Sequence, residues 1–124
     1  MVKTRRWNDP TEADDGLRLL VTRYRPRGVR KGDETWDEWT KELGPSRELH
    51  REYAKEGALD WSAFRQRYLV EMKHAVPRTL IQKLAARHQT GEVVTLLCFC
   101  ADEKHCHRSL LKRLVEDADS SRRG

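Results

Sequence analysis

Val93-Val94-Thr95-Leu96-Leu97-Cys98-Phe99 is the stretch of sequence that decides the fold. Its residues are apolar on both alternating faces, as in a β-strand that helices cover on both sides. A loop follows, and an amphipathic helix is predicted from about Cys106 to residue 118, with leucines three and four positions apart on its apolar face. A buried strand that leads through a loop into a helix is typical of an α/β domain.

A second strand is predicted at 17–22, where the apolar run Leu17-Arg18-Leu19-Leu20-Val21-Thr22 follows the turn signal Asp14-Asp15-Gly16. We expect this strand to lie beside 93–99 in the sheet. Residues 2–7 have a weaker strand pattern, and we expect them to pair with 17–22.

Four further helices are predicted between these two strands, from capping residues, apolar spacing and Gly or Pro stop signals. They run from Thr35 to Leu43, from Ser46 to Gly57, from Trp61 to the residues before Pro77, and from Pro77 to Gly91. The expected fold class is α/β, with a small parallel or mixed sheet of two to four strands flanked by about five helices. One domain is expected over 1–118, followed by a flexible polar tail at 119–124.

The composition indicates which classes of binding partner and which cellular location to expect. Lys and Arg number 25 against 20 Asp and Glu, for a net charge of +5, but the two signs are interleaved along the chain. Nucleic-acid binding is not favoured, because no helix-turn-helix, RNP-like or zinc-finger spacing accompanies the charge. The chain has no run of the roughly 18 apolar residues that a membrane span needs, and its first residues lack the apolar stretch of a signal peptide. We therefore expect no membrane partner and a cytoplasmic location, and the oligomeric state stays open.

Arginines follow both predicted strands. Ligands of open α/β sheets bind outside the carboxyl ends of the strands, where helix N-termini also present unpaired N–H groups. Arg23 and Arg27 come just after the strand at 17–22, and Arg108 and Ser109 lie in the first turn of the last helix. If the two strands are neighbours, these four residues meet, and we expect them to bind a small anionic, phosphate-bearing ligand. Helical spacing places Arg108 away from the leucine face, so its side chain is expected to reach solvent or ligand.

Cys106 and His107 are the candidate catalytic residues of the same site. A helix N-terminus with His and Arg beside it is a place where the pKa of a thiol falls, so Cys106 is a candidate nucleophile. His107 is either a partly buried structural histidine or the group that carries a proton. Cys98 and Cys100 are expected to be small residues packed under a helix.

The same segment also contains residues that could bind a metal ion. Cys100, His105, Cys106 and His107 gather four potential ligands within eight residues, but no second pair has the spacing of a zinc site. No metal and no cofactor are therefore expected. Two alternatives to an anion-binding domain or enzyme stay open: a non-catalytic module that binds nucleic acid or protein through its basic surface, and a thiol redox or metal-responsive protein.

Six stretches spread along the chain carry a family resemblance. They are Asp14-Asp15-Gly16, Arg23-Tyr24-Arg25-Pro26-Arg27-Gly28, Asp37-Glu38-Trp39, Pro45-Ser46-Arg47-Glu48-Leu49, Phe64-Arg65-Gln66-Arg67-Tyr68-Leu69 and Thr95-Leu96-Leu97. With them the chain resembles the YeaO-like branch of the bacterial family called domain of unknown function 488. The resemblance implies a small cytosolic α/β protein of bacteria, and no settled biochemical function comes with it.

Two departures from that branch bear on the site. Relatives usually read Leu-Trp-Pro-Arg-Gly where this chain has Tyr24-Arg25-Pro26-Arg27-Gly28, so Arg27 carries over and Arg25 does not. After the last strand the branch typically has an Asn-His pair and no cysteines, whereas Cys106-His107-Arg108 resembles the Cys-His-Arg motif of the wider family. His107 fits both patterns.

Overall fold

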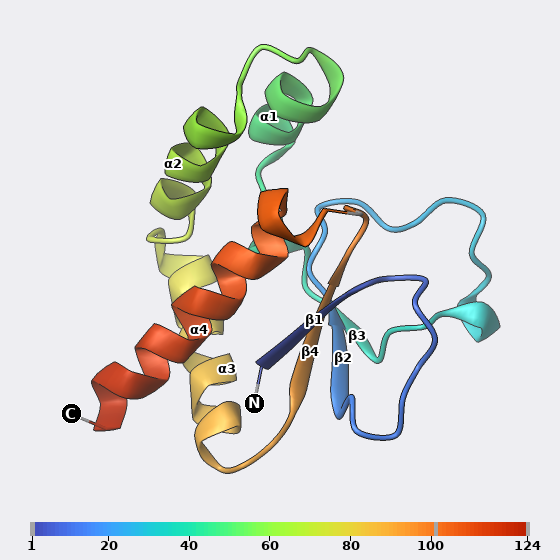
Figure 1. The fold of residues 1–124 in the computed structure, drawn as a ribbon, viewed down its shortest axis with the longest axis vertical. Coiled ribbons are helices and arrows are strands. Elements are labelled where there is room, and N and C mark those ends of the chain that lie inside the picture. The colour runs from blue at the N-terminus through green and yellow to red at the C-terminus, as the bar shows by residue number, and fades with distance from the viewer. Residues whose placement is uncertain (1, 101, 124) are drawn as a thin grey trace.

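Four strands form one sheet in the computed structural model, which describes residues 2–100 and 102–123, the side chains of Glu103 and 119–123 excepted. The strands are β1 (Val2–Arg6), β2 (Leu17–Leu20), β3 (Glu38–Trp39) and β4 (Val94–Cys98), in the spatial order β1-β4-β2-β3 (Figure 1). All three pairings are parallel, and Leu19 lies opposite Leu96. The prediction that the strands near 17–22 and 93–99 are neighbours is confirmed.

Four α-helices complete the described part of the chain. They are α1 (Arg47–His50), which continues as a π turn over Arg51–Lys55, α2 (Trp61–Glu71), α3 (Ala75–Gln89) and α4 (His107–Arg123). Short 3-10 turns occur at Lys31–Asp33, Lys41–Leu43 and Glu103–His105. Among the described helices, none combines the length and the apolar character that crossing a bilayer requires. The fold is α/β with a parallel sheet, as predicted, and has one helix fewer than expected.

The missing helix is the one predicted over 35–43, which is wrong. The segment contains β3 and a 3-10 turn instead. The hydroxyl of Thr35 does not cap a helix but donates to the carbonyl of Trp7, and the indole N–H of Trp39 donates to the carbonyl of Thr22 at 2.8 Å. These long-range hydrogen bonds hold the segment extended at the edge of the sheet, and tertiary contacts override its helical spacing.

The expected pairing of 2–7 with 17–22 is also wrong. β1 pairs with β4, from Val2 opposite Val94 to Arg6 opposite Cys98. β4 is buried along its whole length and takes the position between β1 and β2. A strand that is apolar on both faces is suited to this central position, and the polar pattern of β1 suits the edge.

The helix ends agree closely with the capping signals. The hydroxyl of Ser46 accepts the N–H of Leu49 at 3.1 Å, which caps α1 as predicted. Helix α3 begins two residues before Pro77, so this proline lies in the first turn, where its missing N–H costs nothing. Helix α4 runs to Arg123, and the flexible tail expected at 119–124 stays a prediction whose last residue lies outside the described residues.

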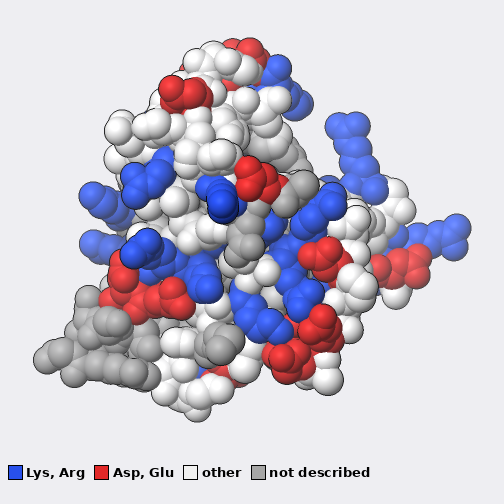
Figure 2. Space-filling view, viewed as in Figure 1, with Lys and Arg blue, Asp and Glu red and all other residues white. Residues whose placement is uncertain are grey.

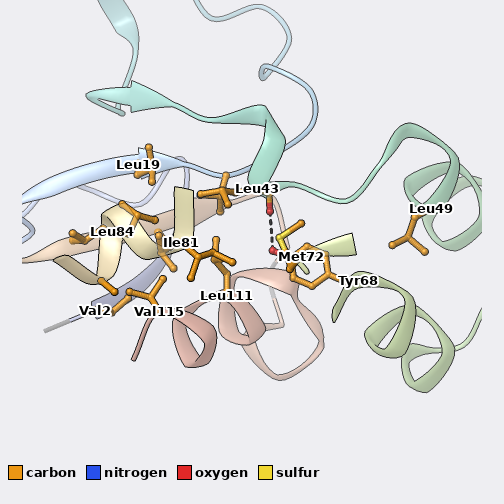
Figure 3. Packing of buried hydrophobic residues seen from close by; sticks show 14 of the residues in the cluster. Val2, Leu19, Leu43, Leu49, Tyr68, Met72, Ile81, Leu84, Leu111 and Val115 are labelled. Carbon is orange, nitrogen blue, oxygen red and sulfur yellow. Dashed lines mark hydrogen bonds between the residues drawn. The ribbon is translucent and has the colours of Figure 1, made fainter. Parts of the chain in front are cut away.

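The two faces of the sheet are covered differently. Figure 3 shows one face packed against the helices, through Val2, Leu19, Ile81, Leu84, Leu111 and Val115. On the other face Leu20 and Leu97 pack against Trp36, with Trp7 beside them. Helices therefore cover one face only, and loops that carry two tryptophans cover the other.

A buried carboxylate anchors the amino end of β2. Asp15 is 1% exposed, and it accepts hydrogen bonds from Lys3 Nζ at 2.8 Å and Arg18 Nη1 at 2.5 Å. The N–H of Glu12 donates to it at 3.0 Å. Burial alone would raise the pKa of Asp15, but these hydrogen bonds outweigh it and hold the pKa well below its ordinary value. The carbonyl of Asp15 accepts from Thr95 Oγ1 at 2.7 Å, which links the register of β2 to that of β4.

Candidate ligand site at the carboxyl ends of β2 and β4

The loops that follow β2 and β4 meet at the carboxyl edge of the sheet (Figure 1). His107, the first residue of α4, ties them together, since its Nε2 lies 2.6 Å from the carbonyl oxygen of Val21. A carbonyl only accepts, so Nε2 carries the proton and Nδ1 remains an acceptor. Burial lowers the pKa of His107, and the ring is therefore neutral at pH 7.

A cavity of about 230 Å³ lies between these loops and the segment around α1. Most of its wall is aromatic or otherwise uncharged, from Thr22, Tyr24, Pro45, Tyr53, Ala54, Phe64 and Phe99. The remaining lining residues are Arg23, three histidines and two cysteines, namely His50, His105, His107, Cys100 and Cys106. Burial lowers the pKa of His50, and the charge of Lys55 acts in the same direction. The cavity is thus a largely apolar chamber, and burial lowers the pKa of two of the imidazoles in its wall, His50 and His107.

A second, wider hollow of about 470 Å³ adjoins this chamber. Its cationic lining residues are Arg25, Arg27 and Lys55, and its other lining residues are Tyr24, His50 and Phe99. The last three also line the chamber, so the two cavities share a wall. The positive charge of the site is concentrated in the outer hollow.

Two of the three arginines after β2 are already engaged. Arg23 donates from Nε to the carbonyl of Pro45 at 3.0 Å. Arg25 pairs with Glu34 at 2.8 Å, and its guanidinium lies 5.4 Å from the ring centroid of Trp36. Arg27 is exposed and, among the described residues, has no ion-pair partner. Arg27 is therefore the arginine of this loop that can meet a ligand without breaking a native contact.

Three thiols converge beneath the chamber, around the guanidinium of Arg108. The sulfurs of Cys98, Cys100 and Cys106 all lie within 4.8 Å of one another. Arg108 Nη1 lies 3.1 Å from Cys98 Sγ, 3.9 Å from Cys106 Sγ and 2.7 Å from the carbonyl oxygen of Cys100. Among the described side chains, no carboxylate forms an ion pair with Arg108, although it is only 3% exposed. The negative charge that a buried guanidinium requires must then come from a thiolate.

The shared hydrogen bonds place that charge on Cys98. Hydrogen bonds from Cys100 and from Cys106 lower the pKa of Cys98, and the charge of Arg108 adds to this effect against its burial. The hydrogen bond between Cys100 and Cys106 lowers the pKa of Cys100, but its hydrogen bond to Cys98 and its burial prevail and raise it to about 11. The hydrogen bonds of Cys106 to Cys100 and to Cys98 raise the pKa of Cys106, and its burial acts in the same direction. The sequence argument expected a lowered pKa at Cys106, whereas the structure lowers that of Cys98, because Cys98 accepts hydrogen bonds from both Cys100 and Cys106.

The structure brings together only part of the predicted residue set. Cys106, His107 and Arg23 line the chamber, and Arg27 lines the outer hollow. Arg108 is buried below the chamber, so the expectation that it reaches solvent is wrong; its hydrogen bonds to the thiol cluster draw it inward. Ser109 is half-buried, its N–H donates to the carbonyl of Cys106 at 3.1 Å, and it lines neither cavity as described.

Sequence reasoning missed the residues that close the site from the helical side. His50 and Tyr53 come from α1 and its π turn, and Phe64 comes from α2. Tyr24 packs edge-on against His50, with ring centroids 5.2 Å apart. The sequence carries no signal for the role of Tyr53 and Phe64 in the cavity wall, because their spacing is that of ordinary core residues on the apolar faces of their helices.

Comparisons with known proteins give a match to one family model and several similar proteins that are all described as uncharacterized. Residues 2–119 match the family described as the active DUF488-N3 subclade. The uncharacterized protein YeaO of Escherichia coli is 44% identical over 71 residues, which cover 57% of this chain and 61% of YeaO. The uncharacterized proteins Rv3073c of Mycobacterium tuberculosis and Mb3100c of Mycobacterium bovis are 31% identical over 114 residues, or 92% of each chain. No solved structure matches.

Proposed function

We propose that this chain, which belongs to the DUF488 family in the subclade described as active, binds and acts on a small molecule that joins a phosphate-like anionic group to a planar apolar body. The observation that carries the proposal is the wall that the two cavities share. A ligand seated across Tyr24, His50 and Phe99 would have its apolar part in the chamber and its charge in the outer hollow.

Arg27 and Lys55 would hold the anionic group. Both line the outer hollow, and neither has an ion-pair partner among the described residues. A guanidinium and an ammonium suit the oxygens of a phosphate, and hydrogen bonds to charged groups are among the stronger ones in proteins. Figure 2 shows that Lys and Arg elsewhere on this side of the molecule are interleaved with Asp and Glu, so net charge alone does not favour a nucleic-acid partner.

The chamber would take the planar part of the ligand. Tyr24 and Phe99 line both cavities, and the rings of Tyr53 and Phe64 in the chamber wall pack against each other at an interplanar angle of 30°, with centroids 4.3 Å apart. Aromatic side chains bury large apolar areas and hold rings by offset or edge-on contacts. A volume of about 230 Å³ suits one ring system rather than a polymer.

His107 would be the proton-transfer group if the bound molecule reacts. Its Nε2–H is held by the carbonyl of Val21, so the ring is fixed and Nδ1 is available to accept a proton. Its lowered pKa keeps it neutral, which is the form that acts as a general base. Arg23 stands at the chamber wall but is committed to the carbonyl of Pro45, which gives it a positioning role.

Three compounds test the proposal, each titrated by calorimetry against the full chain: phenyl phosphate, phenol and inorganic phosphate. Phenyl phosphate combines the aromatic ring of phenol with the anionic group of phosphate. Phenyl phosphate should bind most tightly, because it fills both cavities. Arg27→Gln and Lys55→Gln should each weaken it by about tenfold, as expected for one charge-assisted hydrogen bond. Arg65→Gln removes an exposed arginine of α2 that lines neither cavity, and it should leave the affinity unchanged. Equal affinities for the three probes, or equal effects of Arg27→Gln and Arg65→Gln, would refute the proposal.

A further inference from the structure

We propose that Cys98, Cys100 and Cys106 bind one divalent thiophilic cation, with Zn²⁺ as the representative ion, and that the fourth coordination position faces the chamber. The three sulfurs lie within 4.8 Å of one another. Two sulfurs bound to one tetrahedral Zn²⁺ at about 2.3 Å are about 3.8 Å apart. Closing the cluster onto an ion therefore requires shifts of no more than about 1 Å between sulfurs, which rotation of the Cys100 side chain in its loop can supply.

The backbone presents the three sulfurs from well-placed elements. Cys98 is the last residue of β4, and Cys106 immediately precedes α4. Residue 99 forms a bend between Cys98 and Cys100, and the sulfurs of these two residues converge with the sulfur of Cys106. Ligands on a strand end and a helix start are held in place before the ion arrives, which lowers the cost of ordering the site.

Arg108 supplies the outer support that metal ligands usually have. Its Nη1 donates to Cys98 Sγ at 3.1 Å and to the carbonyl of Cys100 at 2.7 Å, so it orients two of the three ligand residues. Metal-bound cysteines are thiolates. Three thiolates carry three negative charges, and a divalent ion together with the Arg108 guanidinium balances them. The neutral sum favours a divalent over a monovalent ion in a buried site.

The open position of the ion would face the chamber. Cys100 and Cys106 line the chamber, whereas Cys98 is fully buried behind them. Three protein ligands with one position left for water or substrate are typical of catalytic rather than structural zinc sites. The inference goes beyond the proposed function and does not depend on it, because the three sulfurs alone define the site.

The spacing argument from sequence overlooked this set because it counted the wrong ligands. It combined Cys100 and Cys106 with two histidines. In the structure His105 Nδ1 lies 2.8 Å from Asp102 Oδ2, and His107 Nε2 is held by a backbone carbonyl. Cys98, taken as a packed strand residue, completes the cluster in their place.

The test is a titration of the reduced, full chain with Zn²⁺ and with Cd²⁺ in the absence of oxygen. One ion should bind per chain, and Cd²⁺ should produce the ultraviolet charge-transfer absorption of thiolate ligands. Cys100→Ser should weaken Zn²⁺ binding by at least about a hundredfold, since loss of a direct ligand exceeds the 10- to 100-fold loss of an outer partner. Cys100 is half-buried and lies in a loop, so this variant should fold, which circular dichroism verifies. His105→Ala is the matched control and should bind as tightly as the wild type.

Three results would overturn the three-sulfur site. The first is the absence of charge-transfer absorption with Cd²⁺ in the reduced wild type. The second is equal Zn²⁺ affinity in Cys100→Ser and the wild type, and the third is an equal loss of affinity in Cys100→Ser and His105→Ala. Each of these results leaves the anion proposal standing, because that proposal is tested through Arg27 and Lys55 with phenyl phosphate.

Discussion

Replacing Asp15 with Asn should destabilise the fold strongly, although the two side chains have nearly the same shape. The change removes the negative charge that faces the buried Arg18 at 2.5 Å and Lys3 at 2.8 Å. Breaking a buried ion pair by removing one partner costs about 3–5 kcal/mol. Arg18 keeps a carbonyl acceptor at 2.7 Å on Thr35, so we expect the lower end, about 3 kcal/mol, in the free energy of unfolding.

Urea denaturation followed by circular dichroism measures this loss, and the neighbouring residue supplies the control. Asp14 also contacts Lys3, at 3.3 Å, but its side chain is 78% exposed. Exposed ion pairs contribute about 1 kcal/mol or less, so Asp14→Asn should lower the unfolding free energy by well under 1 kcal/mol. If Asp15→Asn costs no more than Asp14→Asn, then Asp15 does not carry the charge balance described above.

The same carboxylate predicts a dependence of stability on pH. The pKa of Asp15 in the folded chain lies below its ordinary value of 3.8. Its contribution is therefore fully present above pH 4 or so and is lost as the pH falls below that value toward the folded pKa. The unfolding free energy of the wild type should fall in this acid range more steeply than that of Asp15→Asn. Parallel curves for the two proteins would contradict the lowered pKa.

Three further substitutions probe the fold and the site. Gly16→Ala should cost about 3 kcal/mol in urea denaturation, because φ is +62° and a Cβ atom would lie 2.2 Å from the carbonyl oxygen of Val93; a change below 1 kcal/mol would contradict this. Tyr68→Phe should cost about 1–2 kcal/mol, since it leaves the carbonyl of Leu43 without the hydroxyl donor at 2.7 Å, and an unchanged thermal midpoint would argue against it. Gly44→Ala would place a Cβ atom 2.4 Å from the N atom of Arg23, so phenyl phosphate binding should weaken in calorimetry, and wild-type affinity would count against our description of this loop.

The fold was largely predictable because its main signals are local. The apolar run of β4, the turn before β2 and the Ser46 cap each act through residues near them in sequence, and each was confirmed. The segment 35–43 was not predictable, because its conformation depends on hydrogen bonds to Trp7 and Thr22, which are distant along the chain. Helical spacing carries no information about such contacts.

The position of the candidate site in the fold was predictable from the sequence, but the set of residues that form it was less so. The order of β2 and β4 brings their loops together, and that order follows from which runs are apolar. Whether a given arginine faces a ligand depends on its partners: Arg108 points inward to sulfur, and Arg27 remains outside. The aromatic wall from α1 and α2 depends on how those helices lie over the strand ends, and no short motif encodes this.

The strand order has a consequence for how the chain reaches its native state. The strand that both β1 and β2 flank is the last one along the chain, and the Asp15–Thr95 hydrogen bond spans 80 positions. Until residues 94–98 insert, β1 and β2 have no common partner and the thiol cluster cannot assemble. Contacts of such long range slow folding. The rate-limiting event should therefore be the insertion of β4, so that the sheet and the candidate site form together.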